Sequence, residues 1–479
     1  MVSYDPLIIA LSAIVGGTLL TYVYDENVPV AVRVCTGAPL GFVGLGLVGL
    51  ICASVLGLTS LTLALTTLIT LSPLLLLTRQ RLRTRVRAEI ELTARSVQRA
   101  VFSMNRRAIS CFLFYVTIAV LLWFFFSGVM FERQDGIFTS IGNNTGDLPF
   151  HLSVITSFVR GENFPPEHPE FAGARLTYPF LIDFIAAIFV RAGAGFQGAL
   201  FLENLLLTLA LVGLLHYWAS KLTRDTVAAF ITPLLVLFSG GLGWMSAGRD
   251  LLKSRHVFAT LMHLPRDYTI MWDGAYRWGN ILNMVAMQRS LLLGVSLCII
   301  VWTLWWQALG AEADPPSADT VLQNRSSKPL QKQRMIAAGA IAGLLPLAHS
   351  YTFILVIGMA ACLALLFRQW LAWGTFFVVA LMVAGPQVLF LSHNSAMHAG
   401  NFWGWQWGLY LHGYNFLWFW ILNTGLSIPL LAIAALWRGR TPAVSQTLLH
   451  FYLPFTFIAK LGKYRLYETG RLKDRVRTF

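Results

Sequence analysis

Charged residues are scarce in this sequence. Asp, Glu, Lys and Arg together make up 12% of the 479 residues, whereas a soluble globular domain carries about 25%. Hydrophobic residues reach 56%, and the mean hydropathy is +0.63. So few charges cannot cover the surface of a water-soluble fold of this length, which excludes an ordinary soluble protein.

Cysteine is also rare, and the first residues do not have the pattern of a secretory leader. The five cysteines lie in or at the edge of apolar runs, and no two have metal-ligand spacing. This excludes a disulfide framework and a zinc site of the usual type. The first residues lack both a basic segment and a small-residue cleavage site, so the first apolar run is predicted to be a retained helix.

Long apolar runs are what the sequence has in abundance. Several reach the ~20 residues that a helix needs to cross the hydrocarbon of a bilayer, at 6–22, 37–56, 61–77, 109–131, 200–219, 291–309, 373–390 and 416–436. We therefore predict an all-α, polytopic transmembrane helical bundle with about 11–12 membrane segments. The run at 177–193 is short and contains Asp183, so we expect a re-entrant or interfacial helix there.

The net charge of +14 is concentrated in two segments, 79–107 and the basic tail 461–479. A nucleic-acid patch is one interpretation. Juxtamembrane loops held in the cytoplasm by the positive-inside rule are the better one, so no nucleic-acid partner is predicted. The chain then divides into N-terminal scaffold helices (1–78), a basic cytoplasmic loop (79–107), a transmembrane working part (108–460) and the tail. The tail follows an apolar run too short to span, so we expect a truncated or altered C-terminus.

The loop after the fourth run holds the most informative motif, "NTGDLPFHLSVITSF" at 144–158. If 147–158 is helical, Asp147 and His151 share one face because they are four residues apart. Asp147 is also well placed as the N-cap of that helix, with Pro149 in the first turn. Ionisable groups at a membrane edge are costly and usually functional, which favours a site. Other polar side chains follow in the same loop: Glu162, Glu167, His168, Arg175, Tyr178 and Asp183.

Two later loops are predicted on the same, non-cytoplasmic side. In 240–290, arginines could hold a phosphate through their forked guanidinium groups, or could anchor to lipid headgroups: Arg249, Arg266, Arg277 and Arg289. In 401–420, Trp403, Trp405 and Trp407 alternate, so they share one face if the segment is extended. Such a face suits a sugar ring or an isoprenoid tail, although an interfacial aromatic belt is the simpler alternative. His349 interrupts an apolar run, as a site residue or as a packed side chain.

The layout of this chain resembles a known family. An outward span, an acidic residue early in the first external loop and the stretch "NFPPEHPEFAGARLTYPF" (163–180) are similar to the GT-C superfamily of integral-membrane glycosyltransferases, over about residues 108–460. Asp147 matches the first-loop acidic residue of that superfamily. Gly146 and Leu148 flank it, where an acidic partner is usual. The resemblance implies sugar transfer from a polyprenyl-phosphate carrier, on the outer face of a bacterial inner membrane.

The resemblance and the residue types together give a hypothesis for the site. Asp147 is the expected base or acceptor orienter in an inverting transfer, with His151 beside it, and the acceptor is a glycan, lipid or protein. The expected substrate-binding residues are His168, Arg175, Tyr178, Arg289, His349, Trp403, Trp405 and Trp407. Asp147 with a second carboxylate could hold Mg²⁺ or Mn²⁺, but no paired spacing identifies one. The alternatives are a transporter or flippase, and a non-enzymatic assembly factor.

Overall fold

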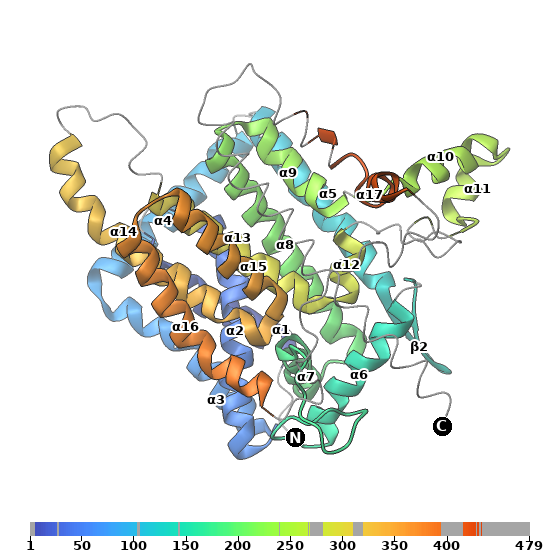
Figure 1. The fold of residues 1–479 in the computed structure, drawn as a ribbon, viewed down its shortest axis with the longest axis horizontal. Coiled ribbons are helices and arrows are strands. Elements are labelled where there is room, and N and C mark those ends of the chain that lie inside the picture. Colours follow the sequence, from blue (N-terminus) through green and yellow to red (C-terminus); the bar gives the residue numbers. More distant parts are fainter. Residues whose placement is uncertain are drawn as a thin grey trace. The chain divides into compact units, whose positions relative to one another are not determined.

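In a computed structural model of the chain, the described residues are 82% helical and form eight helices long and apolar enough to cross a membrane. It describes residues 5–25, 28–102, 106–141, 144–238, 240–266, 268, 281–309, 320–393, 415–427, 429–430 and 433. The protein is therefore a multi-pass membrane protein with an all-α architecture, as the apolar runs predicted (Figure 1).

The described residues hold fewer spans than the 11–12 predicted. The eight are Pro6–Val23, Val30–Leu56, Ser60–Thr78, Ala108–Val129, Phe196–Thr223, Arg289–Leu309, Leu345–Leu366 and Trp370–Ser392. A ninth arises only if α9 (Thr226–Phe238) and α10 (Gly243–Lys253), bent by 84°, form one broken span. The predicted run at 416–436 is not one continuous helix, because α17 (Phe416–Thr424) ends where Gly425 takes a φ of +60°.

The chain divides into two compact units. The first comprises 1–224, 285–353 and 369–396, and it joins the predicted scaffold helices to much of the predicted working part. The second comprises 225–284, 354–368 and 397–479. Its described elements include α9, α10, α11 (Val257–Met262) and α17, while α12 (Ile281–Met287) and α15 (Leu345–Leu366) cross a boundary between the units.

The first unit begins with a tightly packed helix pair, α1 (Pro6–Leu20, extended by the short helix η1 at Thr21–Val23) and α2 (Val30–Leu56). A Cβ atom on Gly17 would lie 2.1 Å from the Gly37 carbonyl oxygen, and one on Gly41 would lie 1.9 Å from the Ala13 carbonyl oxygen. The two backbones therefore approach as closely as small residues allow, which is how helices associate in lipid. Helix α3 (Ser60–Leu71), continued by η2 (Ser72–Thr78), packs beside this pair.

The next elements lead to the predicted external loop. The basic helix α4 (Gln80–Phe102) connects to α5 (Arg106–Val129), and an antiparallel hairpin follows, β1 (Met130–Arg133) and β2 (Gly136–Thr139). Helix α6 (Asn144–Arg160) begins three residues earlier than predicted, and the Asn144 amide donates to Thr139 Oγ1 at 3.1 Å. Asp147 is therefore inside the first turn and is not the N-cap, and Pro149 lies within the helix.

Helix α7 (Leu181–Ala192) lies in the short segment 177–193, for which the sequence predicted a re-entrant or interfacial helix. Twelve residues extend about 18 Å, well short of the ~30 Å of a hydrocarbon core. Every residue from Leu181 to Phe189 is buried inside the protein, and Gly46 and Gly49 of α2 accept the side chains of Leu181 and Ile188. Protein surrounds this helix, which is the condition under which a polar residue is tolerated at such a position.

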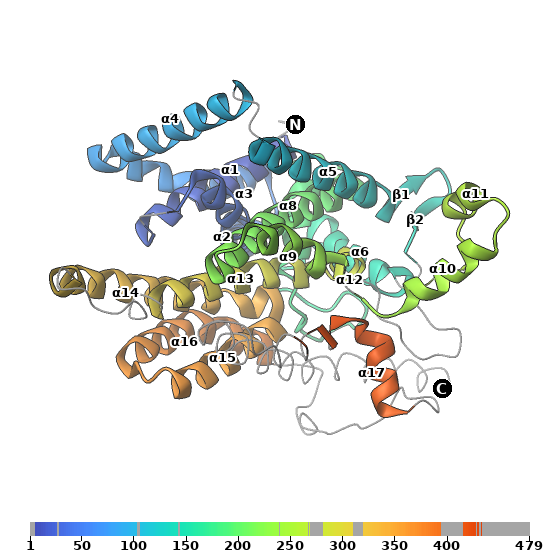
Figure 2. The ribbon, with the colours of Figure 1, turned by 90° about the horizontal axis from the view of Figure 1, so that it is seen from above.

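The core of the first unit is completed by α8 (Phe196–Thr223), α13 (Arg289–Leu309), α14 (Thr320–Gly343) and α16 (Trp370–Ser392), with α14 and α16 side by side (Figures 1 and 2). Helices α8 and α13 are the most deeply buried of the spans. Trp305 of α13 is fully buried against the rings of Trp373 and Phe376, at centroid distances of 5.5 Å and 5.1 Å.

Candidate functional site

Three helices of the first unit bring ionisable side chains together in the interior. His151 of α6 places Nδ1 2.8 Å and 3.0 Å from the two carboxylate oxygens of Asp183 on α7. Arg289, the first residue of α13, donates from Nη2 to Asp183 Oδ1. His151 and Arg289 are each 2% exposed and Asp183 is fully buried. Burying a charge is tolerated when it is paired, and Asp183 is paired on both sides.

A fourth ionisable group approaches from α8. Glu203 is fully buried, and its carboxylate lies 3.8 Å from Arg289 Nε, which is close enough for an ion pair but not for a hydrogen bond. Within the described residues, neither oxygen of Glu203 nor Nε of Arg289 has a hydrogen-bond partner. Arg289 thus faces two carboxylates, and it forms a hydrogen bond with only one of them, that of Asp183.

Two ionisable groups near Arg289, Asp183 and Tyr178, lie outside the candidate spans. Their surroundings determine whether each is protonated. Burial raises the pKa of Asp183, but the charges and hydrogen bonds of His151 and Arg289 outweigh it and hold that pKa below its usual range. For Tyr178, burial and then the Asp183 charge raise the pKa, with a further increase from Asp147, although Ser290 and Arg289 oppose them. Asp183 is therefore a carboxylate and Tyr178 a neutral hydroxyl at neutral pH.

Asp147 lies one helical turn before His151 and is half-buried, unlike the cluster beneath it. Its effect on the pKa of Tyr178 places its charge near that hydroxyl. The Tyr178 ring packs against His151 and Phe150, at centroid distances of 5.8 Å and 5.3 Å. Sequence therefore predicted a grouping of Asp147, His151 and Tyr178 that the structure contains, with Asp147 on its more accessible side.

The loop 161–180, between α6 and α7, is held in shape by one amide. Asn163 donates to Ser157 Oγ at 3.1 Å and to the Glu167 carbonyl at 2.8 Å, and it accepts from the Glu167 N–H at 2.8 Å. The loop carries two predicted binding residues, and it brings one of them, His168, to the site. His168 is half-buried with its ring 5.6 Å from that of Phe150, and Arg175 is half-buried with its guanidinium 5.8 Å from the Phe390 ring.

A small cavity adjoins the ionic cluster. Its polar lining is Asn144, Gln197, Asn204 and Arg289, and the remainder is apolar, including Phe126 and Leu148. Asn204 Oδ1 is buried without a hydrogen-bond partner in the described part of the chain. The cavity thus offers an unused acceptor next to an arginine that also has an unused donor.

His349 is buried in α15 at a kink where its backbone is not helical (φ −163°, ψ 95°). Its Nδ1 accepts from the Thr352 N–H at 3.2 Å and lies 2.7 Å from Thr352 Oγ1. Gly294 of α13 packs directly on it, since a Cβ there would lie 2.7 Å from the Cβ of His349. These contacts support the packed alternative that the sequence left open, in which His349 stabilises a helix break.

The other predicted residues are placed elsewhere or lie outside the described residues. Trp403, Trp405, Trp407 and Arg277 belong to the latter group. In the second unit, Arg266 binds Asp250 through Nε and Nη2 at 2.9 Å, so its guanidinium already holds a carboxylate. As for Mg²⁺ or Mn²⁺, no group of three His, Cys, Asp or Glu side chains within the described residues could hold a metal ion.

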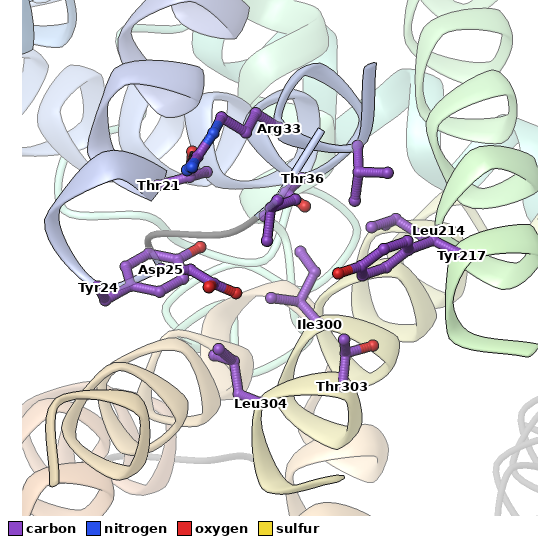
Figure 3. Close-up of a pocket in the computed structure, with 12 residues that line it drawn as sticks. Thr21, Tyr24, Asp25, Arg33, Thr36, Leu214, Tyr217, Ile300, Thr303 and Leu304 are labelled. Carbon is purple, nitrogen blue, oxygen red and sulfur yellow. Dashed lines mark hydrogen bonds between the residues drawn. The ribbon is translucent and has the colours of Figure 1, made fainter. Parts of the chain in front are cut away.

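A second small cavity lies near the ends of α8 and α13 that are farther from the ionic cluster (Figure 3). Its lining includes Asp25, Arg33 and Tyr217, and it reaches Thr303, fourteen residues or about 21 Å along α13 from Arg289. Arg334 Nη2 is 3.4 Å from Asp25 Oδ1, and its Nη1 donates to the Gln307 carbonyl. The C-terminal parts of α1, α8 and α13 therefore lie together around this second cavity, and the ionic cluster lies toward the N-terminal end of α13.

Two residues of the cluster have no assigned role in the hypothesis drawn from the sequence. Asp183 is named there among the polar side chains of the first external loop and as the charge in a short apolar run, and Glu203 lies inside a predicted span. The signal is present in both cases, because an ionisable residue within an apolar segment is rare and usually paired.

Comparison of the chain with protein-family models, with curated proteins and with solved structures finds no match.

Proposed function

We propose that this protein is a membrane glycosyltransferase that moves a sugar from a polyprenyl-phosphate donor to an acceptor hydroxyl, with Asp147 as the base. The observation that carries the proposal is the gradation of burial at one site. A half-buried carboxylate and a neutral tyrosine hydroxyl lie above a buried His151–Asp183–Arg289 network, at an end of membrane-spanning helices. A lipid-borne phosphosugar presents its reactive carbon at that depth.

The proposed reaction is a single displacement. The acceptor oxygen attacks the anomeric carbon while Asp147 takes the acceptor proton, and the polyprenyl phosphate leaves with the electron pair of the broken C–O bond. The sugar is transferred with inversion. A positioned carboxylate contributes about 10²–10⁴-fold to such a proton transfer. Tyr178, which stays protonated, can donate a hydrogen bond to the sugar or the phosphate.

The buried residues hold the base in place. His151 bonds Asp183 through Nδ1, which fixes its ring orientation one turn from Asp147. Arg289 is committed to Asp183 and faces Glu203, so in this arrangement it is a positioning residue for the network. Arg175 is the better candidate for the carrier phosphate, because it is half-buried at the loop surface and the described residues place only an aromatic ring, Phe390, against its guanidinium.

The test is transfer by the full chain reconstituted in liposomes, with defined polyprenyl-phosphate hexoses and pentoses as donors and a membrane extract as acceptor source. We expect Asp147→Asn to lower the turnover by at least about 10²-fold. The matched control is Asp135→Asn, which removes an exposed carboxylate from the β1–β2 turn of the same external segment. Equal turnover in both variants would overturn the role of Asp147.

A transporter or flippase remains the second candidate, because Glu203 and Arg289 place charges within or at the end of spans and α15 is broken at His349. Both features are typical of transport pathways. Movement of a fluorescent polyprenyl-phosphate sugar between leaflets of protein-containing liposomes, without change of its mass, would favour this function. Conversion to free carrier phosphate and a new glycoside would favour the transferase.

A further inference from the structure

We propose that helix α4 is an in-plane membrane helix that binds a surface of anionic lipid headgroups. Its 23 residues extend about 34 Å between two candidate spans, Ser60–Thr78 and Ala108–Val129. A helix connecting two spans in this way starts and ends at the membrane surface. The membrane is thus the partner that both neighbouring elements already contact.

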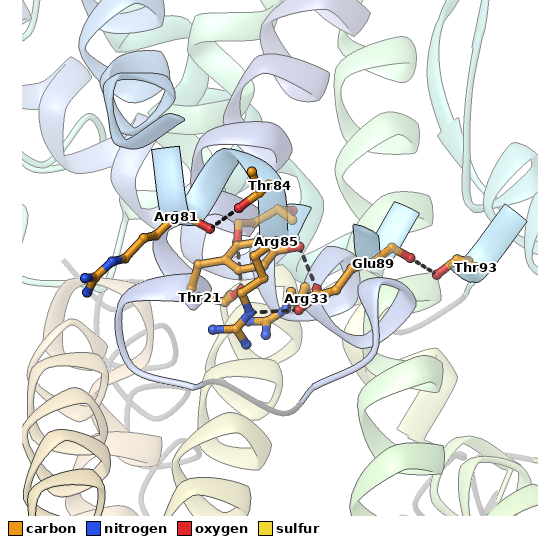
Figure 4. Close-up of polar contacts among 9 residues, drawn as sticks. Thr21, Arg33, Arg81, Thr84, Arg85, Glu89 and Thr93 are labelled. Atoms are coloured by element: carbon orange, nitrogen blue, oxygen red, sulfur yellow. Dashed lines mark hydrogen bonds and ion pairs between the residues drawn. The ribbon is translucent and has the colours of Figure 1, made fainter. Parts of the chain in front are cut away.

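The first half of α4 is held against the N-terminal helices by one carboxylate. Glu89 accepts from Tyr22 Oη at 2.9 Å, from Arg33 Nε at 3.3 Å and from Arg85 Nε at 3.0 Å (Figure 4). The guanidinium of Arg33 also stacks 3.8 Å above the Tyr22 ring. Since Arg33 is fully buried, this contact fixes both the position and the rotation of α4 at Glu89.

Helix α4 carries an apolar stripe, and the described part of the protein leaves its second half uncovered. Leu82, Val86, Ile90 and Val97 recur at helical spacing and share one face. The first two are half-buried, whereas Ile90 is 53% and Val97 is 58% exposed. Residues 90–99 are all exposed, so the stripe runs off the protein surface at the point where the Glu89 anchor ends.

The charge of α4 decides which apolar surface it suits. The helix has six arginines (Arg81, Arg83, Arg85, Arg87, Arg95 and Arg99) against two glutamates, Glu89 and Glu91, which leaves four positive charges uncompensated. Arg95 pairs with Glu91 at 3.4 Å, in a bridge where both side chains are more than 60% exposed. An uncharged partner would leave these arginines without a counter-charge. An anionic leaflet attracts Arg83 and Arg87, which lie about 40° and 80° of helix rotation from Val97, while the stripe enters the acyl boundary.

The experiment uses the full chain, with its five cysteines replaced, in nanodiscs of phosphatidylcholine alone or with about one third phosphatidylglycerol. A spin label is placed at Val97→Cys on the stripe. The matched label is at Ala88→Cys, which is also exposed and lies nine residues, or half a turn of rotation, from Val97. Accessibility to oxygen and to a water-soluble nickel complex reports the depth of each label, and a doxyl-lipid reports contact with acyl chains.

In the anionic nanodiscs we expect the label at 97 to be protected from nickel, accessible to oxygen and broadened by the doxyl-lipid, while the label at 88 stays in water. Arg83→Gln or Arg87→Gln, which are exposed and flank the stripe, should each lower the ratio of docked to undocked helix by about fivefold. Arg160→Gln, which removes an exposed arginine at the end of α6, should leave the ratio of docked to undocked helix unchanged.

Equal nickel accessibility at 97 and 88 would overturn the proposal. So would protection at 97 that is the same in neutral lipid, or protection without doxyl contact, which would indicate a protein partner.

Discussion

The buried network makes a quantitative prediction about which charge matters most for stability. Arg289→Met removes the only cation within reach of both Asp183 and Glu203 among the described contacts. Breaking a buried ion pair by removing one partner costs about 3–5 kcal/mol. Asp183→Asn is expected to cost less, because the freed guanidinium can close the 3.8 Å gap to Glu203 and convert that approach into a hydrogen bond.

The assay is the free energy of unfolding of purified variants in one detergent, measured against wild type by steric trapping or by denaturation followed through tryptophan fluorescence. The triple variant Asp183→Asn, Glu203→Gln, Arg289→Met replaces the two carboxylates and the guanidinium together and should recover part of the loss, since none of these three groups is then left as an unpaired buried charge. Non-additivity of about 0.5–3 kcal/mol between the single substitutions is expected for residues in direct contact. The reasoning fails if Arg289→Met is no more destabilising than Arg160→Met, or if the triple variant is worse than Arg289→Met alone.

Three further predictions concern pH, packing and substrate binding. Because the pKa of Asp183 is held below 3.8, its contribution to stability is present above the unfolded value and is lost as the pH falls through the folded one. Unfolding free energy should therefore be level above about pH 5 and fall below about pH 4, and Asp183→Asn should flatten that fall. Gly41→Leu should separate α1 from α2 and cost about 3 kcal/mol or more in the same unfolding assay, whereas Gly44→Leu, where a Cβ meets open space, should be near neutral. Arg175→Ala should weaken the binding of polyprenyl phosphate about 10-fold or more by isothermal titration while leaving stability unchanged, and an unchanged affinity would assign the phosphate to another cation.

Much of the fold was predictable because membrane spans depend on a local property. Runs of about 20 apolar residues are sufficient to identify a span, and seven of the eight apolar runs singled out correspond to candidate spans. The run at 416–436 is the exception, since hydropathy takes no account of a backbone break such as the one at Gly425. The short α7 was predicted not to cross, and its length and burial explain why.

The candidate site was only partly predictable because its contacts are between residues far apart in sequence. Asp147 and His151 share a helix, so their spacing was informative. Asp183 is 32 residues from His151 and 106 from Arg289, and no local pattern pairs them. Arg289 was expected to hold a phosphate because its forked guanidinium lies in a predicted external loop, but the carboxylate of α7 already binds that guanidinium. Glu203 was overlooked inside an apolar run, although its rarity there was itself a signal.

The lipid that accompanies the purified protein gives the clearest test of the proposed transfer, because the sugar does not have to be chosen beforehand. Wild type and Asp147→Ala would be purified in mild detergent or nanodiscs and their bound lipids identified by mass spectrometry. We expect polyprenyl phosphate or a polyprenyl-phosphate sugar enriched over bulk lipid, with the sugar-bearing form accumulating in Asp147→Ala. Bulk phospholipid alone in both samples would contradict the proposal that this site handles a lipid-linked sugar.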